Sequence, residues 1–293
     1  MTTHGKSVRG AAGSAADEAY KHHYIPKFYQ KQWAGADNKL SVYARRENSE
    51  IMVRRKSPKQ SGYEPYLYSV PGLPPEQAHT VETKFMREMD SLACRAMHYM
   101  IGKIEKPMDI ELRSAWSRFL LSLLLRHPAS ISRLKAKMLA VTADVVKDFV
   151  DHYGEEERAR LQVQVGIALT LQSMIDNTGV GMYLNRMDWR VTEVVRADYT
   201  LLTSDRPVVL SNGLLGPDGH MALPISPRHV FIAANNADLH KKVRGLSGKQ
   251  IVRAFNEVTV EQADRWVFGA DDRQLQFVRN RMSTNPQRDL LPV

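Results

Sequence analysis

Two adjacent histidines, His22 and His23, open the aromatic-rich stretch HHYIPKFYQKQW near the start of the chain. Imidazole titrates near neutral pH and binds transition metals, so one ring can serve as a metal ligand and the other as a general base. Neighbouring side chains of an extended segment point to opposite faces, so the two rings need not share a site. The alternative is a packing role, in which one ring bonds to the backbone and the other faces solvent.

Asp205 is a further candidate catalytic or metal-binding residue, because it ends a Thr-Ser-Asp run directly before Arg206 and Pro207. A carboxylate at a strand end can bind a divalent cation or orient a histidine. Asp in such a place also stabilises turns by accepting backbone N–H groups. We predict that His22 or His23 lies near Asp205, with His22 and Asp205 as metal ligands.

Several cationic and amide side chains are candidates for substrate binding. Arg126 follows the apolar run FLLSLLL, where it either caps the end of a helix or clamps a phosphate. Asn256 lies within a helical pattern, where it either binds substrate or bonds across to a sheet. A basic cluster precedes a tyrosine-rich loop, so it either holds nucleic acid by charge and stacking or forms a solvated face. This cluster consists of Arg54, Arg55 and Lys56.

The composition favours an anionic partner. Among 293 residues, 41 Lys and Arg outnumber 32 Asp and Glu, which gives a formal net charge of +9. Such a balance is typical of proteins that bind nucleic acid, although many basic proteins do not. The single cysteine, Cys94, excludes an intrachain disulfide and a cysteine-rich zinc site. Because no apolar run is long enough to span a bilayer, we expect a soluble cytoplasmic protein without membrane contact.

The hydrophobic patterns predict an α+β protein: a mainly helical middle, with short β-strands near the N-terminus and in the last third. Residues 1–20 read as a flexible tail and 21–293 as a single domain. The helices should bury Met89, Trp116, Phe119, Leu120 and Leu123 together. The ranges expected to be helical are 78–106, 109–127, 129–153, 155–177 and 247–270, with Asp109 as a cap at a helix start and Gly154 and Gly179 as caps at helix ends. The ranges expected to be strands are 39–46, 50–56, 188–195, 199–205, 206–212 and 228–236, and the first two should pair through a turn at 47–49.

Four segments in this order resemble an uncharacterised bacterial family, catalogued as domain of unknown function 4238. They are HHYIPKFYQKQW, TSDRPVV, LPISPRHVFIA and FNEVTVEQADRWVFG. His127, in LLRHP, departs from the Arg-Thr-Pro-like element of the family, and Ile225 stands where Leu is commoner. The resemblance covers nearly the whole chain after the tail, and it implies no activity.

HHYIP also resembles the opening of His-Asn-His nucleases, although residues 45–47 lack the further histidine of that motif. We therefore weigh two functions. One is a metal-assisted phosphodiesterase or nuclease, in which His22 and His23 supply ligand and base. Asp205 would then bind the divalent metal and Arg126 the phosphate charge. The alternative is a non-catalytic nucleic-acid or protein interaction module, in which the same residues hold the fold. Convergence on an open pocket favours the enzyme, and burial in a closed hydrogen-bond network favours the module.

Overall fold

The computed structural model describes residues 20–46, 49–103, 108–211 and 213–285. Nearly all of the predicted tail, and most of the predicted turn between the first two strands, lie outside these residues. The α+β prediction is confirmed, because long helices occupy the middle of the chain and short strands lie near its start and in its last third. No helix in the described part is long and apolar enough to cross a membrane.

Within the described residues, the strands form three antiparallel sheets. The smallest pairs β1 (Lys21–His23) with β4 (Tyr63–Pro65), so the His-His stretch is an edge of a two-stranded ribbon. The second sheet has the order β3-β2-β10-β6, with bounds Ile51–Lys56, Leu40–Arg45, Trp266–Gly269 and Thr203–Ser204. The third has the order β5-β9-β8-β7, with bounds Asp188–Glu193, His229–Ala234, His220–Ser226 and Val209–Ser211.

The predicted pairing of the first two long strands is confirmed, since Leu40 lies opposite Lys56 in the β2–β3 ladder. The helical prediction for 247–270 is wrong at its end. Helix α10 (Gly248–Glu261) ends before this range does, and β10 follows between β2 and β6. Trp266, Val267 and Phe268 are aromatic or β-branched, which favours a strand. A short apolar run of this kind also fits another helical turn, so the sequence pattern does not separate the two.

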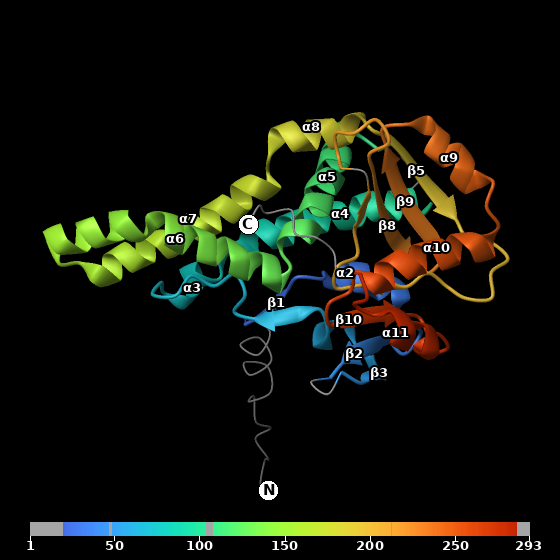
Figure 1. Cartoon of the computed structure of the whole chain (residues 1–293), viewed down its shortest axis with the longest axis horizontal. Helices are drawn as coiled ribbons and strands as arrows, with labels where there is room; N and C mark the ends of the chain where they lie inside the picture. The colour runs from blue at the N-terminus through green and yellow to red at the C-terminus, as the bar shows by residue number, and fades with distance from the viewer. Residues whose placement is uncertain (1–19, 47–48, 104–107, 212, 286–293) are drawn as a thin grey trace, which may run out of the picture.

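The helical middle is confirmed with small shifts of its boundaries. The longer helices are α4 (Arg87–Met100), α5 (Ile110–Leu125), α6 (Pro128–Tyr153), α7 (Glu156–Ile175), α8 (Thr178–Arg186), α9 (Ala237–Arg244), α10 (Gly248–Glu261) and α11 (Leu275–Arg281). Asp109 caps α5 by accepting the N–H of Leu112 at 2.8 Å, and Gly154 ends α6 in the left-handed conformation. Gly179, expected to end a helix, lies instead inside α8. In Figure 1, α6 and α7 form an arm that projects from the body, while α9 and α10 lie beside the third sheet.

The range expected as one helix from 78 to 106 is interrupted at its start. Residues Val81–Met86 form a π-helix, η3, which continues directly into α4. A π turn holds one more residue than an α turn, and such turns are frequent at functional sites. Glu82 lies on this turn, and its carboxylate accepts the backbone N–H of His23.

The main core lies where α4 and α5 meet the third sheet. The five side chains predicted to be buried together, from Met89 to Leu123, all belong to this one cluster. The Trp116 ring lies 4.9 Å from that of Phe119 and 5.6 Å from that of Phe231, between centroids, which ties α5 to β9. The core therefore holds α5 firmly, and with it the residues at the C-terminal end of α5.

Candidate functional site

The predicted motifs come together around the junction of α5 and α6, where Arg126 and His127 are adjacent. His127 takes an extended backbone before Pro128, so α5 ends at this point and α6 begins. The Nδ1 atom of His127 accepts the N–H of Ala129 at 3.2 Å, which makes His127 the N-cap of α6. The side chains of Arg126 and His127 reach two different polar groups.

Arg126 belongs to the first group and has no exposed surface. Its Nη1 atom donates to Asp90 Oδ1 at 3.1 Å, and its guanidinium carbon lies 5.5 Å from the centroid of Phe119. Within the described part of the chain, its Nε and Nη2 atoms have no hydrogen-bond partner. Arg126 thus neither caps α5 through its side chain nor reaches solvent, so a phosphate of a polymer cannot touch it in this conformation.

Glu82 and Asp90 surround Arg126 with acidic groups that are hard to ionise. Burial, reinforced by Asp90, raises the pKa of Glu82 to about 7. Burial also raises the pKa of Asp90, although Arg126 opposes this shift. The Oε1 atom of Glu82 accepts the N–H of His23 at 3.3 Å. The group therefore contains a carboxyl that titrates near neutral pH beside a buried guanidinium.

His22 is enclosed by aromatic and imidazole rings. Its Nδ1 atom accepts the N–H of Tyr68 at 2.9 Å, so the proton of the neutral ring lies on Nε2. Nε2 lies 3.0 Å from His79 Nδ1, and the His22 ring stacks on Tyr68 with centroids 5.5 Å apart. The Tyr68 hydroxyl in turn donates to the carbonyl of Arg126. His22 is thus part of a closed network that joins β1 to the end of α5.

His23 points to the other face of β1. Its Nδ1 atom lies 3.2 Å from the carbonyl oxygen of Lys21, and its ring lies 5.5 Å from that of Tyr63 between centroids. The two histidines therefore make different contacts, as the alternation of an extended strand requires.

Asp205 is buried and holds the turn that leads into β10. Its carboxylate accepts three backbone N–H groups, from Asp264 at 2.9 Å, Arg265 at 2.6 Å and Trp266 at 2.9 Å. Burial raises the pKa of Asp205 to about 6, although these donors favour the ionised form. This is the turn-stabilising role that the sequence left open, and it joins β6 to the segment before β10.

His127, Asp205 and Asp264 form a cluster whose side-chain ligand atoms all lie within 4.8 Å of one another. His127 Nε2 lies 3.6 Å from Asp264 Oδ2. Because Nδ1 of His127 accepts the N–H of Ala129, the proton of the neutral ring lies on Nε2 and faces the carboxylates. A metal ligand needs a lone pair there. The cluster is therefore suited to a histidine–carboxylate interaction and poorly suited to a metal ion.

Tyr24 connects the His-His stretch to this cluster. Its ring stacks on Trp266 with centroids 6.1 Å apart and meets the edge of His127 at 5.5 Å. Burial, with Asp205 nearby, raises the pKa of Tyr24 well above its usual range. The structure thus brings Asp205 together with His127 and Asp264. It places His22 against Tyr68 and His79 instead.

The basic cluster lies in β3, where successive side chains alternate between the two faces of the sheet. Arg55 is held by Asp37 at 2.6 Å and by the carbonyls of Lys39 and Ala270. Arg54 and Lys56 share the opposite face. The three cations therefore do not form a single surface.

Asn256 is buried on α10 and joins this helix to the segment before β6. Its Oδ1 atom accepts the N–H of Leu202 at 2.8 Å. Its Nδ2 atom donates to the carbonyl of Thr200 and to Gln274 Oε1, both at 2.9 Å. The same side chain lines a pocket of about 290 Å³ between α10 and α11. Asn256 thus has the structural role left open by the sequence and lies at the base of a concave site.

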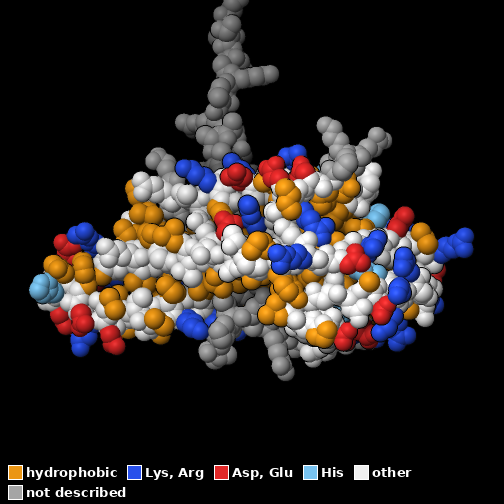
Figure 2. Space-filling view, turned by 90° about the horizontal axis from the view of Figure 1, so that it is seen from above, with side chains coloured by type: hydrophobic (Ala, Val, Ile, Leu, Met, Phe, Trp, Pro, Cys, Tyr) orange, Lys and Arg blue, Asp and Glu red, His pale blue; other side chains and the backbone are white. Residues whose placement is uncertain are grey.

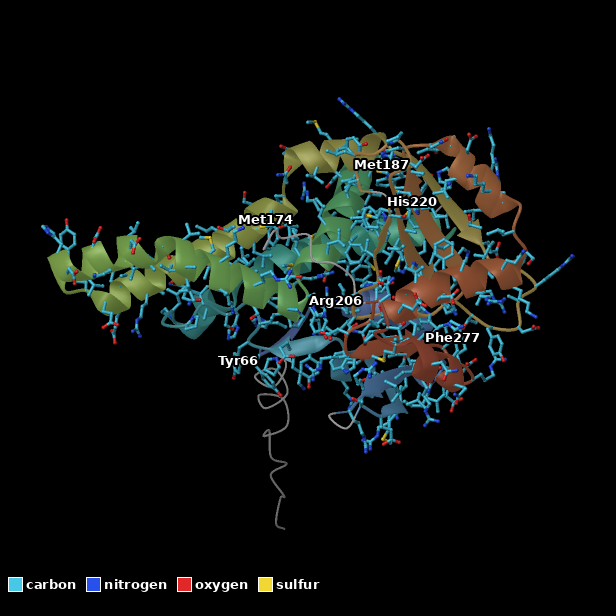
Figure 3. The ribbon with its side chains drawn as sticks, in the orientation of Figure 1. Tyr66, Met174, Met187, Arg206, His220 and Phe277 are labelled. Atoms are coloured by element: carbon cyan, nitrogen blue, oxygen red, sulfur yellow. The ribbon has the colours of Figure 1, made fainter. Side chains whose placement is uncertain are left out.

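This α10–α11 pocket combines cations with aromatic rings. Its lining includes Lys249, Arg253, Asn256, Gln274, Tyr199, Phe277, Arg281 and Asp198. Lys249 and Arg253 form no ion pair with any described residue, whereas Arg281 pairs with Glu257 at 3.3 Å and lies 4.4 Å from the Phe277 centroid. Figure 3 shows Phe277 on α11, beneath α10. The four-residue spacing of Lys249 and Arg253 is visible in the sequence, whereas the approach of Tyr199 and Phe277 to them is not.

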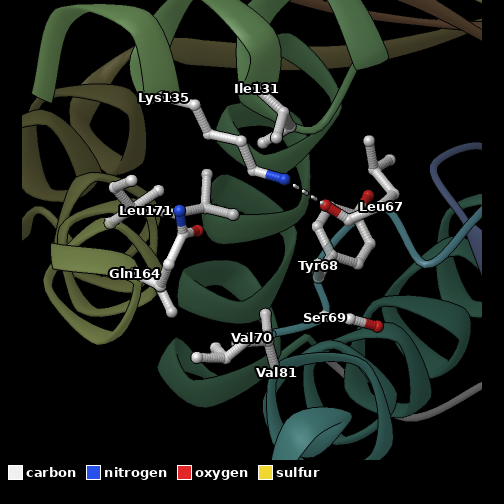
Figure 4. Close-up of a pocket in the computed structure, with 11 residues that line it drawn as sticks. Leu67, Tyr68, Ser69, Val70, Val81, Ile131, Lys135, Gln164 and Leu171 are labelled. Carbon is white, nitrogen blue, oxygen red and sulfur yellow. Dashed lines mark hydrogen bonds between the residues drawn. The ribbon is translucent and has the colours of Figure 1, made fainter. Parts of the chain in front are cut away.

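A second pocket lies beside the first polar group, between α6, α7 and the loop after β4 (Figure 4). Its volume is about 20 Å³, which admits about one water molecule. The Nζ atom of Lys135 crosses it to donate to the carbonyl of Leu67 at 3.3 Å. The lining is otherwise mainly apolar. This cavity is too small for a substrate.

The fold and these contacts define an α+β protein in which buried polar groups link β1 to the end of α5 and β6 to the segment before β10. The chain belongs to the family described as "Protein of unknown function (DUF4238)", whose profile matches residues 21–273. No curated protein and no solved structure matches the chain.

Proposed function

We propose that the chain binds nucleic acid and that the α10–α11 pocket receives one nucleotide unit of a single strand. The observation that carries the proposal is that two cations without an ion pair to any described residue, Lys249 and Arg253, share one pocket with two aromatic rings, Tyr199 and Phe277. A nucleotide combines a phosphate with a planar base, so this chemistry matches both of its parts.

The phosphate side of the pocket is provided by the start of α10. Lys249 lies in the first turn, where the N-terminal end of the helix dipole adds positive potential. Ser247 accepts the N–H of Gln250, and the side chain of Gln250 accepts the N–H of Ser247 in return. This capping box fixes the first turn and with it the position of Lys249. Arg253 lies one turn further on, so both cations can contact the same phosphate.

The base side of the pocket is provided by Tyr199 and Phe277, on which a planar ring can stack. The floor consists of the Asn256–Gln274 pair, whose amides are held by each other and by Thr200. Amides held in this way keep part of their hydrogen-bonding capacity for a base edge. A volume of about 290 Å³ lies at the lower end of small-ligand sites, which suits a single base.

The proposal does not extend to cleavage. His22, Arg126 and Asp205 have no exposed surface, and His22 and Asp205 are already engaged by backbone N–H groups. Of the His127–Asp205–Asp264 cluster, only Asp264 is substantially exposed, at 48% of its side chain. Burial of this kind supports the interaction module over the nuclease.

The test is fluorescence anisotropy with labelled single-stranded DNA, single-stranded RNA and duplex DNA of equal length over a salt series. Lys249→Ala combined with Arg253→Ala should weaken single-strand binding and reduce the log–log salt slope by about 0.7 per lost contact. The matched control is Arg54→Ala with Lys56→Ala, which removes the same charge outside the pocket. Binding that is absent at low salt, or that both double variants weaken equally, would contradict the proposal.

A further inference from the structure

A further pocket, which we call the Arg113 pocket, lies between the end of α4, the start of α5 and strands β5 and β9. Its volume is about 570 Å³, which is within the usual range of small-molecule sites. It shares no lining residue with the α10–α11 pocket. Its walls combine two arginines with aromatic and methionine side chains, and Figure 2 shows how hydrophobic and basic side chains alternate over one face of the molecule.

The guanidinium of Arg113 is fixed by its surroundings. Its Nε atom donates to the carbonyl of Asn185 at 2.9 Å, and its Nη2 atom donates to the carbonyl of Met187 at 3.0 Å. The guanidinium carbon lies 3.8 Å from the ring centroid of Trp189. The indole N–H of Trp189 donates in turn to the carbonyl of Leu184 at 2.9 Å. Arg113 is therefore preorganised, and a ligand would not have to order it.

These contacts use one edge of the Arg113 guanidinium and leave another. A guanidinium carries five N–H groups in a planar fork. The side edge, which contains Nε, is taken by the two carbonyls. The end edge consists of Nη1 and the second N–H of Nη2, and it has no partner among the described residues. Two parallel N–H groups of this kind match the two oxygens of a carboxylate.

The charge of Arg113 also lacks an ion pair within the described residues. Burial lowers the pKa of Arg113, and the charge of Asp188 opposes this shift. Asp188 is engaged elsewhere, because its carboxylate lies 3.1 Å from Nε of Arg190 and 3.8 Å from Nε2 of His240. The two carbonyls that Arg113 holds need donors but no positive charge. A structural role thus explains the side edge and leaves the charge and the end edge to an anionic ligand.

The other walls of the Arg113 pocket suit an apolar body. Tyr99 and Met100 come from the end of α4, and Met108 lies just before α5. Methionine side chains adapt to the shape of a bound ring. The Trp189 and Phe231 rings meet edge to face with centroids 5.1 Å apart behind them. An inorganic anion or a sugar would reach Arg113 but would make little use of these walls.

We propose that the Arg113 pocket binds a small aromatic carboxylate. The carboxylate pairs with the end edge of Arg113, and the ring packs against Tyr99, Met100 and Met108. Arg190 lies at the same pocket but is already paired with Asp188, so it contributes less to the affinity. Because the two pockets have no residue in common, this ligand and a nucleotide unit can bind at the same time.

Isothermal titration calorimetry with cinnamate, its neutral amide cinnamamide, and acetate tests this inference. The unaltered chain should bind cinnamate, and cinnamamide and acetate should each bind about tenfold more weakly or worse, since each lacks one half of the ligand. Arg113→Gln should weaken cinnamate by about tenfold or more and leave cinnamamide nearly unchanged. A variant that merely lost its fold would weaken both ligands, so the ratio of the two affinities identifies the role of the charge.

Two control variants separate this pocket from a general effect of charge. Arg118→Gln removes the same charge at an exposed position of the same helix and should leave the affinity for cinnamate unchanged. Lys249→Ala with Arg253→Ala removes the cations of the α10–α11 pocket and should also leave it unchanged. Circular dichroism reports whether each variant is folded.

Three results would overturn the inference. They are an unaltered chain that binds cinnamate no better than cinnamamide, an Arg118→Gln variant that loses as much affinity as Arg113→Gln, and a loss of cinnamate binding in the Lys249 and Arg253 double variant. If Arg113→Gln is not folded, the first and the third results still decide, because they need only the unaltered chain and the other pocket's variant.

Discussion

Glu82 is the residue whose ionisation should affect the whole protein most. Its pKa is about 7 in the folded chain, against an ordinary value of 4.5. The folded state therefore binds more protons than the unfolded state between these values, and the free energy of unfolding falls as pH rises from about 4.5 to about 7. Above pH 7 this contribution is constant. The loss amounts to at most about 3 kcal/mol, and less because water partly screens the carboxylate.

Glu82→Gln should remove this pH dependence. The amide oxygen can still accept the N–H of His23, while the charge is gone. Urea unfolding measures the difference in the free energy of unfolding between the variant and the unaltered chain. This difference should be more favourable to the variant at pH 8 than at pH 5. Glu88→Gln, an exposed change on α4, the helix that continues from η3, is the control and should have the same effect at both pH values. An equal effect of Glu82→Gln at both pH values would contradict the pKa assigned to Glu82.

Asp205 should behave as a structural carboxylate and not as a metal ligand. Asp205→Asn replaces one acceptor oxygen by an NH₂ group that faces backbone donors, so it should lower the free energy of unfolding by about 2 kcal/mol. Manganese or magnesium should leave the thermal midpoint of the unaltered chain unchanged relative to EDTA. If a specific metal site existed, metal at a hundredfold excess over its Kd would raise the free energy of unfolding by about 2.7 kcal/mol. A clear metal-dependent rise that Asp205→Asn abolishes would reverse this assignment.

At the scale of elements, α5 should carry the largest share of stability. Phe119 is fully buried and contacts Phe28, Tyr29 and Trp116, so Phe119→Ala should cost about 3–5 kcal/mol. Ile110→Ala, at a position 71% exposed on the same helix, should change stability by less than about 0.5 kcal/mol. Denaturant unfolding of both variants measures the difference. A cost below about 1 kcal/mol at Phe119 would mean that this part of the core can collapse onto the cavity.

The elements differ in how well the sequence could predict them. Helices such as α5 and α6 repeat their apolar spacing over many turns, and Asp109 and Gly154 mark their ends, so local patterns suffice. Strand β10 has only four residues. It is a strand because β2 and β6 flank it, and no local signal conveys that. The extended HHY stretch, by contrast, correctly indicated that His22 and His23 point apart.

The site was harder to predict than the elements. The sequence indicated the turn-stabilising role of Asp205 and the cross-linking role of Asn256 as alternatives, because both follow from local chemistry. The contacts of Tyr24 with His127 and of His22 with His79 join segments that are distant along the chain. Single-sequence spacing does not report such contacts. The raised pKa of Glu82 also depends on contacts between distant segments, so the sequence could not predict it.

At the scale of the whole molecule, a net charge of +9 says little about where a partner binds. Lys249 and Arg253, which form no ion pair with any described residue, lie in the body at the α10–α11 pocket, away from the arm formed by α6 and α7.

This placement predicts that a short strand responds to charge at the pocket and hardly to charge on the arm. A short oligonucleotide occupies the pocket, so Asp144→Lys with Asp148→Lys, at the far end of α6, should leave its affinity nearly unchanged apart from a small gain from added charge. Anisotropy titrations with a short single strand at one salt concentration measure the affinity of this double variant, of Lys249→Ala with Arg253→Ala, and of the unaltered chain. If the change on the arm raises the affinity as strongly as the change at the pocket lowers it, the pocket is not where the strand binds.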